Sequence, residues 1–322
     1  MKKFALQLMQ NCGGFAAARA MSAEMARILM YHNFSGSGDD PDAVSMAALR
    51  RQFDYLHRHF SVVPLSKLIE SLETGKKLEN RMVVLTVDDG RRNCYECMFP
   101  ALKEFQMPAT LFVVSSFINR EDWIWTDKVL WLSEQSSRPV DLAPQQIDGF
   151  FHRLNRLRPE IRTAAIEAVA NGMGLAIPVG PPPKYAPCSW QELREMADSG
   201  LVEIGSHTVT HPIFSSVTDD ESFQELTRSR AQIEEGVGKT VTSFCFPNGQ
   251  MGDFRLSQVR QVRDAGYRGA VAAYPGLVGP GADPCQLPRI GVSGYTDPLI
   301  FSKRLDGAEH YQMKLREWLG LS

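Results

Sequence analysis

Short apolar runs alternate with amphipathic stretches along most of the chain, and this alternation restricts the fold more than any other feature. The runs occupy residues 26–32, 82–87, 109–114, 201–205, 243–246, 269–273 and 287–292. They are rich in Val, Ile, Leu and Phe, as is typical of strands buried on both faces. Helical patterns lie between them at residues 46–60, 221–236 and 255–266. We therefore predict an α/β fold with a parallel sheet.

One long region, residues 118–187, interrupts this alternation. It begins with three tryptophans, Trp123, Trp125 and Trp131, and ends in a proline-rich stretch. A chain of 322 residues can form a single barrel-type domain, so we predict one domain in which this region is a helical insertion. The other predicted segments are an N-terminal amphipathic segment (1–25), the barrel itself (26–300) and a C-terminal helical tail (301–322).

The charge balance and the cysteines argue against several classes of protein. A formal net charge of −2 provides no basic surface for a nucleic-acid backbone. The six cysteines are too sparse for a disulfide scaffold in a chain of this length. Cys94 and Cys97 form a CxxC pair, but a zinc ribbon needs a second pair. We expect reduced cysteines and no nucleic-acid partner.

The N-terminal sequence MKKFALQLMQN superficially resembles a signal peptide. Gln7, Gln10, Asn11 and Arg19 interrupt its apolar character, and no later run approaches the roughly eighteen apolar residues of a membrane span. We therefore expect a cytoplasmic protein. The amphipathic segment leaves open a peripheral contact with the inner membrane.

Polar residues follow several of the predicted strands at the point where each strand ends. Asp88 and Asp89 follow the run MVVLTV, His207 follows the run LVEIG, and His32 follows ARILMY. The carboxyl ends of parallel barrel strands converge on one face, where active sites are found. These side chains are therefore expected to meet, although they are far apart in the sequence.

Two of these segments together indicate a metal site. TVDDG alone is equally typical of a turn or a helix cap. GSHTVTH adds His207 and His211, which can converge on one cation if the segment forms a single helical turn. Two histidines and one carboxylate leave metal positions open for water and substrate, as hydrolysis requires.

TVDDG and SHTVTH together resemble the first two motifs of the NodB-type polysaccharide deacetylase family, carbohydrate esterase family 4, whose usual forms are TFDDG and H-[ST]-x-x-H. The resemblance implies a distorted (β/α)7-8 barrel. It also implies that Asp88 is the catalytic base and that Asp89, His207 and His211 bind a divalent metal. Zinc is the expected metal, with cobalt, nickel and manganese as alternatives.

The sequence departs from the family pattern in two places. The third motif, R-x-P-[YF], is matched by CFPN, where Cys245 replaces the arginine that orients the base. We expect Arg289, near the end of a late strand, to take over this function. The final family motif, Leu-His-Asp, does not follow Arg289. Because His32 ends an early apolar strand, we predict a circular permutation that makes His32 the general acid, with Tyr31 pointing away from it.

The resemblance implies that the chain removes an N-acetyl group from an amino-sugar glycan and releases acetate. A lipid-linked or nucleotide-linked precursor of a surface polysaccharide is the expected substrate. Two alternatives remain open, namely a deformylase acting on a lipid-linked sugar and an inactive carbohydrate-binding homologue. A glycosidase is disfavoured, because its two carboxylates seldom come from adjacent residues. The tryptophans of the insertion either stack on sugar rings or pack its core.

Overall fold

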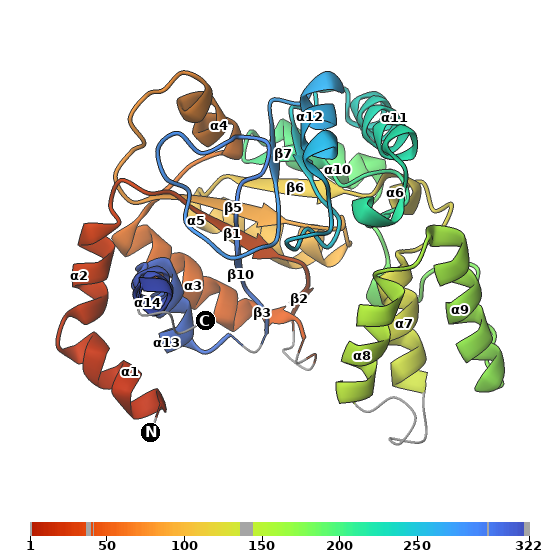
Figure 1. Cartoon of the computed structure of the whole chain (residues 1–322), viewed down its shortest axis with the longest axis horizontal. Helices are drawn as coiled ribbons and strands as arrows, with labels where there is room; N and C mark the ends of the chain where they lie inside the picture. Colours follow the sequence, from red (N-terminus) through yellow and green to blue (C-terminus); the bar gives the residue numbers. More distant parts are fainter. Residues whose placement is uncertain (1, 37–39, 41, 136–143, 295, 319–322) are drawn as a thin grey trace.

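The computed structural model of the chain describes residues 2–36, 40, 42–135, 144–294 and 296–318. Parts of the predicted insertion (136–143) and of the predicted tail (319–322) lie outside these ranges. At the centre is a curled sheet with the strand order β10-β1-β5-β6-β7-β8-β9, and β4 pairs with β5 (Figure 1). Its neighbouring strands run parallel, as predicted.

The strands of this sheet match the predicted apolar runs closely, except for β4, which was not predicted. They are β1 (Arg27–Tyr31), β4 (Ser61–Val62), β5 (Met82–Val87), β6 (Ala109–Val113), β7 (Val202–Ser206), β8 (Ser243–Cys245), β9 (Gly269–Val271) and β10 (Ile290–Gly291). The run predicted at 287–292 is a regular strand only in β10. A parallel bridge between Val271 and Leu287 nevertheless connects β9 to the segment that leads into β10, which brings the two ends of the sheet together. A separate small sheet contains β2 (Phe34–Ser35) and β3 (Val44–Ser45).

Helices surround the outside of the curled sheet. They are α3 (Met46–His59), α5 (Phe99–Phe105), α10 (Trp190–Asp198), α11 (Asp219–Val237) and α12 (Leu256–Asp264), with a π-helical turn at Cys94–Met98 before α5. Helix α4 (Leu65–Glu73) instead packs its buried residues against the interior face of the sheet. Capping boxes begin α10 at Ser189 and α11 at Thr218, where each hydroxyl accepts a hydrogen bond from the backbone N–H of the glutamate three residues later, and that glutamate's carboxylate accepts one from the backbone N–H of Ser189 or Thr218. The entry points of these helices, and hence the strand ends before them, are therefore well defined.

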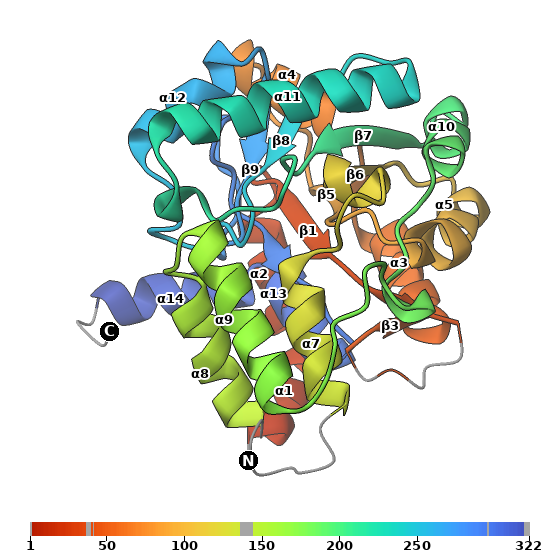
Figure 2. The ribbon, with the colours of Figure 1, turned by 90° about the vertical axis from the view of Figure 1, so that its right-hand side faces the viewer.

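The insertion forms a group of helices at the carboxyl ends of the strands. Helix α6 (Ser115–Ile118) leads into it, and its elements are α7 (Trp125–Gln135), α8 (Pro144–Leu154), α9 (Pro159–Gly172) and a 3-10 turn at Pro183–Tyr185. Figure 2 shows α7, α8 and α9 side by side. Trp123 and Trp125 are buried, and Trp131 packs edge-on against Trp123. The tryptophans thus form the core of the insertion.

Side-chain alternation in the strands determines which residues face the barrel interior. In β5, Val83 and Leu85 pack against the outer helices, whereas Met82 and Val84 belong to a second apolar cluster inside the curl. Successive side chains of a strand point to opposite faces, so Asp88 continues the inward row of Met82 and Val84. The regular pleat of the sheet therefore carries this charged residue into the barrel interior.

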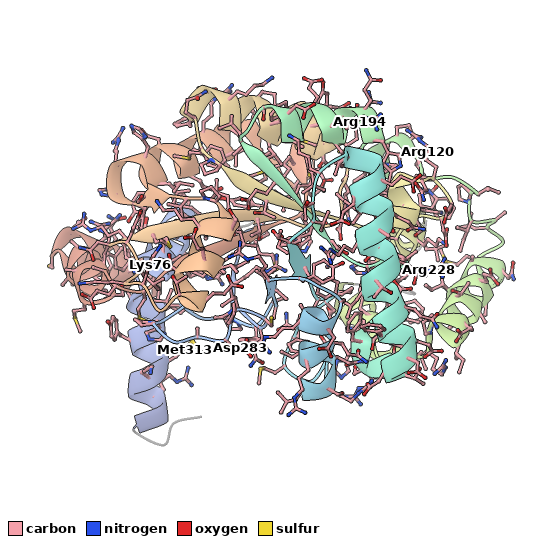
Figure 3. All side chains as sticks on the ribbon, turned by 90° about the horizontal axis from the view of Figure 1, so that it is seen from above. Lys76, Arg120, Arg194, Arg228, Asp283 and Met313 are labelled. Atoms are coloured by element: carbon pink, nitrogen blue, oxygen red, sulfur yellow. The ribbon has the colours of Figure 1, made fainter. Side chains whose placement is uncertain are left out.

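The two chain ends pack together on the side of β1. Helices α1 (Lys2–Asn11) and α2 (Gly14–Met21) meet α13 (Pro298–Leu305) and α14 (Ala308–Trp318), and α14 projects from the body of the molecule (Figures 1 and 3). The fully buried Arg27 of β1 donates hydrogen bonds to the Leu305 carbonyl (2.8 Å) and the Ser22 carbonyl (2.7 Å). Among the described helices, none combines the length and the apolarity that a membrane span requires.

We predict that Gly205→Ala destabilises the barrel, because a Cβ atom at Gly205 would lie 2.5 Å from the Phe112 ring. Overpacking of this kind costs about 1–3 kcal/mol. The free energy of unfolding in urea measures the effect. Gly172→Ala at the end of α9 is the matched control, since no atom lies within 4 Å of its added Cβ, and the change should stay within about 0.5 kcal/mol. Equal stabilities of the two variants would contradict this account of the interior.

Candidate metal centre and active site

The carboxyl ends of the strands open into a cavity of about 560 Å³. The structure brings every residue predicted for the site to its lining: His32, Asp88, Asp89, His207, His211 and Arg289. These residues come from positions next to β1, β5, β7 and β10. The strand order explains their meeting, since β10 and β5 flank β1.

Asp89, His207 and His211 form a compact triad with the geometry of a metal site. The Nε2 atoms of the two histidines lie 3.2 Å apart, and each lies 3.8 Å from Asp89 Oδ1. A tetrahedral site with metal–ligand bonds of about 2.1 Å places its ligands about 3.4 Å apart. The three donor atoms therefore fit a divalent cation between them with only small adjustments.

The surroundings keep these donor atoms ready to bind a cation. Burial lowers the pKa of His207, and burial together with His207 lowers the pKa of His211 to about 3, so both rings are neutral near pH 7. His207 Nδ1 lies 2.8 Å from the Cys245 carbonyl and donates to it, which leaves the Nε2 lone pair free. Although burial opposes ionisation, Arg91 and the nearby histidines hold the pKa of Asp89 below its usual value.

The backbone around Asp89 explains why a glycine follows it. Asp89 has φ +76° and Gly90 has φ +84°, which places two successive residues in the left-handed region. A Cβ on Gly90 would also lie 3.0 Å from the side chains of Ile118 and Val113. The Asp-Asp-Gly sequence thus makes a sharp turn that directs Asp89 towards the histidines, while Asp88 continues the inward row of β5.

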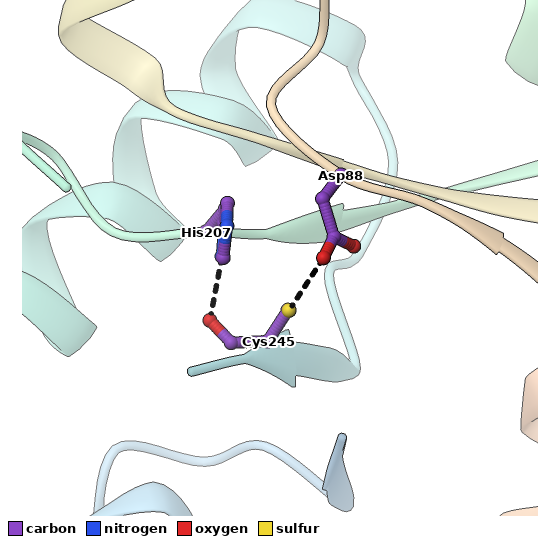
Figure 4. A group of neighbouring side chains, drawn as sticks. All are labelled: Asp88, His207 and Cys245. Carbon is purple, nitrogen blue, oxygen red and sulfur yellow. Dashed lines mark hydrogen bonds between the residues drawn. The ribbon is translucent and has the colours of Figure 1, made fainter. Parts of the chain in front are cut away.

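A second group of potential ligands, Asp88, His207 and Cys245, is shown in Figure 4. The Cys245 thiol donates to Asp88 Oδ2 at 3.5 Å, and its Sγ lies 3.1 Å from Arg289 Nη2. Burial raises the pKa of Cys245 well above its usual value, so the thiol keeps its proton. A guanidinium already supplies the positive charge here, so Asp89, His207 and His211 are the stronger candidate for a metal site.

Arg289 forms a bidentate ion pair with Asp88. Its Nη1 and Nη2 donate to the two oxygens of Asp88, each at 2.7 Å, and both side chains are almost completely buried. Burial opposes ionisation of Asp88, but the charge and hydrogen bonds of Arg289 hold its pKa well below the usual range. The structure therefore places Arg289 in the position needed to orient Asp88. The guanidinium also lies beside Cys245, the residue that matches the arginine of the third motif.

His32 lies at the mouth of the site. Its Nε2 is 3.6 Å from Asp88 Oδ2, and its side chain is 43% exposed. Tyr31 points the other way, as predicted, because its hydroxyl donates to Gln52 of α3 at 3.0 Å within the outer core. His32 can therefore contact a molecule in the cavity, whereas Tyr31 cannot.

Sequence reasoning missed a second buried ion pair next to the triad. Arg91 Nη2 lies 3.4 Å from Asp89 Oδ2 and also pairs with Asp127 of α7. The position of Arg91 directly after Asp-Asp-Gly was an available signal. Nothing in the sequence pointed to Asp127.

The insertion supplies one wall of the cavity. Its lining residues are Thr126, Leu130, Ser133, Glu134, Phe151, Lys184 and Tyr185. None of Trp123, Trp125 and Trp131 is among the lining residues, which agrees with their packing in the insertion core. Among the described residues, Phe151, Tyr185 and Phe246 are the aromatic side chains that reach the cavity.

The fold and site define a barrel protein with an Asp-His-His triad, suited to a metal, beside an aspartate held by arginine. The sequence model described as Polysaccharide deacetylase matches residues 75–270, more than half of the chain. The chain belongs to the polysaccharide deacetylase family. This family is metal-dependent, and the triad is a candidate site for the metal.

Two curated relatives carry the same description, poly-beta-1,6-N-acetyl-D-glucosamine N-deacetylase. The protein from Escherichia coli K12 is 25% identical over 183 residues, which cover 56% of this chain and 20% of the relative. The protein from Staphylococcus aureus N315 is 20% identical over 261 residues, covering 78% of this chain and 68% of the relative. The chain thus spans about a fifth of the length of the E. coli relative.

Solved structures agree on the fold. The Streptococcus pyogenes deacetylase PplD superposes with a TM-score of 0.60 at 15% identity, covering 87% of this chain and 98% of that one. IcaB from Ammonifex degensii gives a TM-score of 0.60 at 19% identity, covering 88% and 97% of the respective chains. The predicted deacetylase-type (β/α) barrel is confirmed.

We predict that Arg289→Met slows turnover and moves the acid limb of the kcat/KM profile to higher pH. Without the guanidinium, the largest influence that lowers the pKa of Asp88 is lost while burial still raises it, so its pKa rises and the carboxylate protonates at a pH where the wild type is still ionised. Zinc content should stay near that of the wild type, because Arg289 contacts no member of the triad. An unchanged pH profile would show that Arg289 has a purely structural function.

Proposed function

We propose that the chain hydrolyses the N-acetyl group of an amino-sugar glycan and releases acetate and a free amine. One observation carries this proposal: the Asp88 carboxylate, held ionised by Arg289, lies in the cavity beside the triad of Asp89, His207 and His211. Amide hydrolysis needs a base, a polarising charge and an acid in one place, and this arrangement contains candidates for all three.

In this proposal Asp88 is the general base. Its fixed orientation directs a carboxylate oxygen into the cavity, where it accepts a proton from the attacking water. When bound, a divalent cation supplies the charge that polarises the acetyl carbonyl and makes the water more acidic. Zinc fits the two imidazoles and one carboxylate best, with cobalt, nickel or manganese as alternatives. Arg289 keeps Asp88 ionised before the substrate binds.

His32 is the proposed general acid. Departure of the amine requires a proton on its nitrogen, and His32 is half-exposed at the cavity mouth with Nε2 3.6 Å from Asp88 Oδ2. At this distance His32 and Asp88 can contact the same bound substrate, and the His32 ring can donate a proton to the leaving group. The neighbouring Tyr31 donates a hydrogen bond to Gln52 on the opposite face of β1.

An amino-sugar polysaccharide, or a lipid-linked or nucleotide-linked precursor of one, is the proposed substrate class. The relatives described as poly-beta-1,6-N-acetyl-D-glucosamine N-deacetylases support it. A cavity of about 560 Å³ has room for sugar units, and Phe151 and Tyr185 of the insertion can pack against their faces. A lipid-linked sugar deformylase remains the rival within the same chemistry. A glycosidase is disfavoured, because Arg289 holds Asp88 and Asp89 faces the histidines.

Product analysis tests the proposal. Purified protein reconstituted with zinc is incubated with N-acetylated and N-formylated glucosamine oligomers, and acetate, formate and free amine are measured. We expect acetate and amine in equal amounts. Formate alone would establish the deformylase instead. An absence of both products with either substrate, at full zinc content, would favour an inactive carbohydrate-binding homologue.

The two adjacent aspartates should fail differently when substituted. Asp88→Asn should keep zinc and the fold but lose nearly all turnover, because the base is gone while the triad is intact. Asp89→Asn should lose zinc affinity as well, because one of three protein ligands is weakened. Elemental analysis after dialysis and steady-state kinetics make the comparison. Equal zinc loss in both variants would refute this division of functions.

His32→Ala should retain zinc and lose about a hundredfold or more in turnover, as is typical of a missing general acid. Tyr31→Phe is the matched control on the same strand, and it should leave turnover nearly unchanged while costing about 1 kcal/mol of stability through the lost Gln52 hydrogen bond. The loss in His32→Ala should shrink for substrates whose leaving amine needs less protonation. A His32→Ala enzyme within a few fold of the wild type would falsify this assignment.

A further inference from the structure

The insertion reaches the metal triad through a buried chain of charges. Asp127 in the first turn of α7 is fully buried and pairs with Arg91, which is 7% exposed. Arg91 Nη2 then lies 3.4 Å from Asp89 Oδ2, while the other oxygen, Oδ1, faces the two histidines. Arg91 thus contacts the carboxylate oxygen that the metal site does not use. This contact leaves Oδ1 directed at the cation position.

The ion pair is not arranged for stability alone. Asp127 Oδ2 and Arg91 Nε are both buried and have no hydrogen-bond partner within the described part of the chain. A pair serving only as mutual counter-ions would gain from a two-pronged contact that satisfies these atoms. Arg91 instead divides its contacts between Asp127 and Asp89. One Nη2 group of Arg91 therefore connects the insertion to Asp89.

A second contact from the same helical turn reaches the other side of the triad. The indole Nε1 of Trp125 donates to the His211 carbonyl at 3.2 Å. His211 has φ +56°, an uncommon conformation for a residue with a side chain, which the surroundings must stabilise. Glu225 fixes the preceding loop by accepting from the Val209 and Thr210 amides. The indole then holds the loop at the ligand itself.

We propose that the first turn of α7 is a positioning element for the metal centre. Asp127 acts through Arg91 to orient Asp89, and Trp125 acts on the backbone of His211. The insertion therefore positions two residues of the triad in addition to lining the cavity. This inference rests on the metal triad of the proposed function, but it does not depend on which glycan or acyl group is the substrate.

The Asp127→Asn variant tests the charged contact. The amide keeps the size of the carboxylate but cannot neutralise the positive charge of Arg91. Arg91 then interacts more strongly with the Asp89 carboxylate and competes with the metal for that negative charge. We expect zinc affinity to fall about 10–100-fold, the usual effect of losing an outer partner of a metal ligand. Asp122→Asn is the matched control, because Asp122 pairs with Lys128 near the same helix but is exposed. It should bind zinc like the wild type.

Trp125→Phe tests the second contact by removing the indole N–H while keeping a ring to pack against Arg162. We expect a several-fold loss of zinc affinity and a changed visible spectrum of the cobalt-substituted protein, because His211 is free to shift. Trp131→Phe is the control, since Trp131 packs on Trp123 and does not contact the triad. Its zinc affinity and cobalt spectrum should match the wild type.

The measurement is the zinc dissociation constant by chelator competition, together with the urea stability of the metal-free protein. The double variant Arg91→Gln/Asp127→Asn should bind zinc more tightly than Asp127→Asn alone, because the unbalanced guanidinium is gone. If Asp127→Asn does not fold, the double variant and Trp125→Phe carry the test in its place. Wild-type zinc affinity in both of the variants that carry the test would overturn the proposal. Equal losses of zinc affinity in the two controls, Asp122→Asn and Trp131→Phe, would also overturn it. Retained zinc in the His207→Ala/His211→Ala variant would instead overturn the triad on which it rests.

Discussion

The ion pair between Arg289 and Asp88 is the interaction on which the rest of the site depends. Both side chains lie inside the barrel, where an isolated charge is strongly disfavoured, so each needs the other. Arg289 also donates to the Ala272 carbonyl (2.7 Å) after β9 and to Thr86 Oγ1 (3.0 Å) in β5. One guanidinium therefore connects the last strands of the sheet to β5. The closure of the barrel and the orientation of Asp88 consequently depend on the same side chain, Arg289.

The barrel interior is divided along its axis between apolar packing and polar chemistry. Towards the amino ends of the strands, Ile28, Met82 and Val84 form an apolar cluster with α4. Towards the carboxyl ends, the same inward rows continue with Thr86 and Asp88. Because the apolar part excludes water below the site, the electrostatic contacts above it act in a low-dielectric environment and are stronger than at a surface. The polar site is thus supported by the apolar packing beneath it.

Much of this site was predictable because it depends on local sequence rules. The apolar runs predicted the strands, and their ends predicted where Asp88, His32 and His207 lie. Arg289 was predictable because the third motif lacks its arginine and Arg289 lies near the end of a late strand. The pair formed by Arg91 and Asp127 was not, because it depends on how α7 docks against the barrel. The burial of the tryptophans was likewise undecided, since an aromatic residue is equally suited to a core and to a sugar-binding surface.

The order of the functional residues along the chain matters little once the sheet has closed. His32 lies near the N-terminus and Arg289 near the C-terminus, yet β1 pairs with β10 and with β5, so both side chains reach Asp88 from adjacent strands. The helices at the two chain ends reinforce this closure. Arg27 of β1 binds the carboxyl ends of α2 and α13 through their backbone carbonyls, an arrangement that a cation favours. A circular permutation that moves the strand before His32 would therefore preserve the site, because the neighbours of that strand in the sheet, and not its position in the sequence, determine where His32 lies.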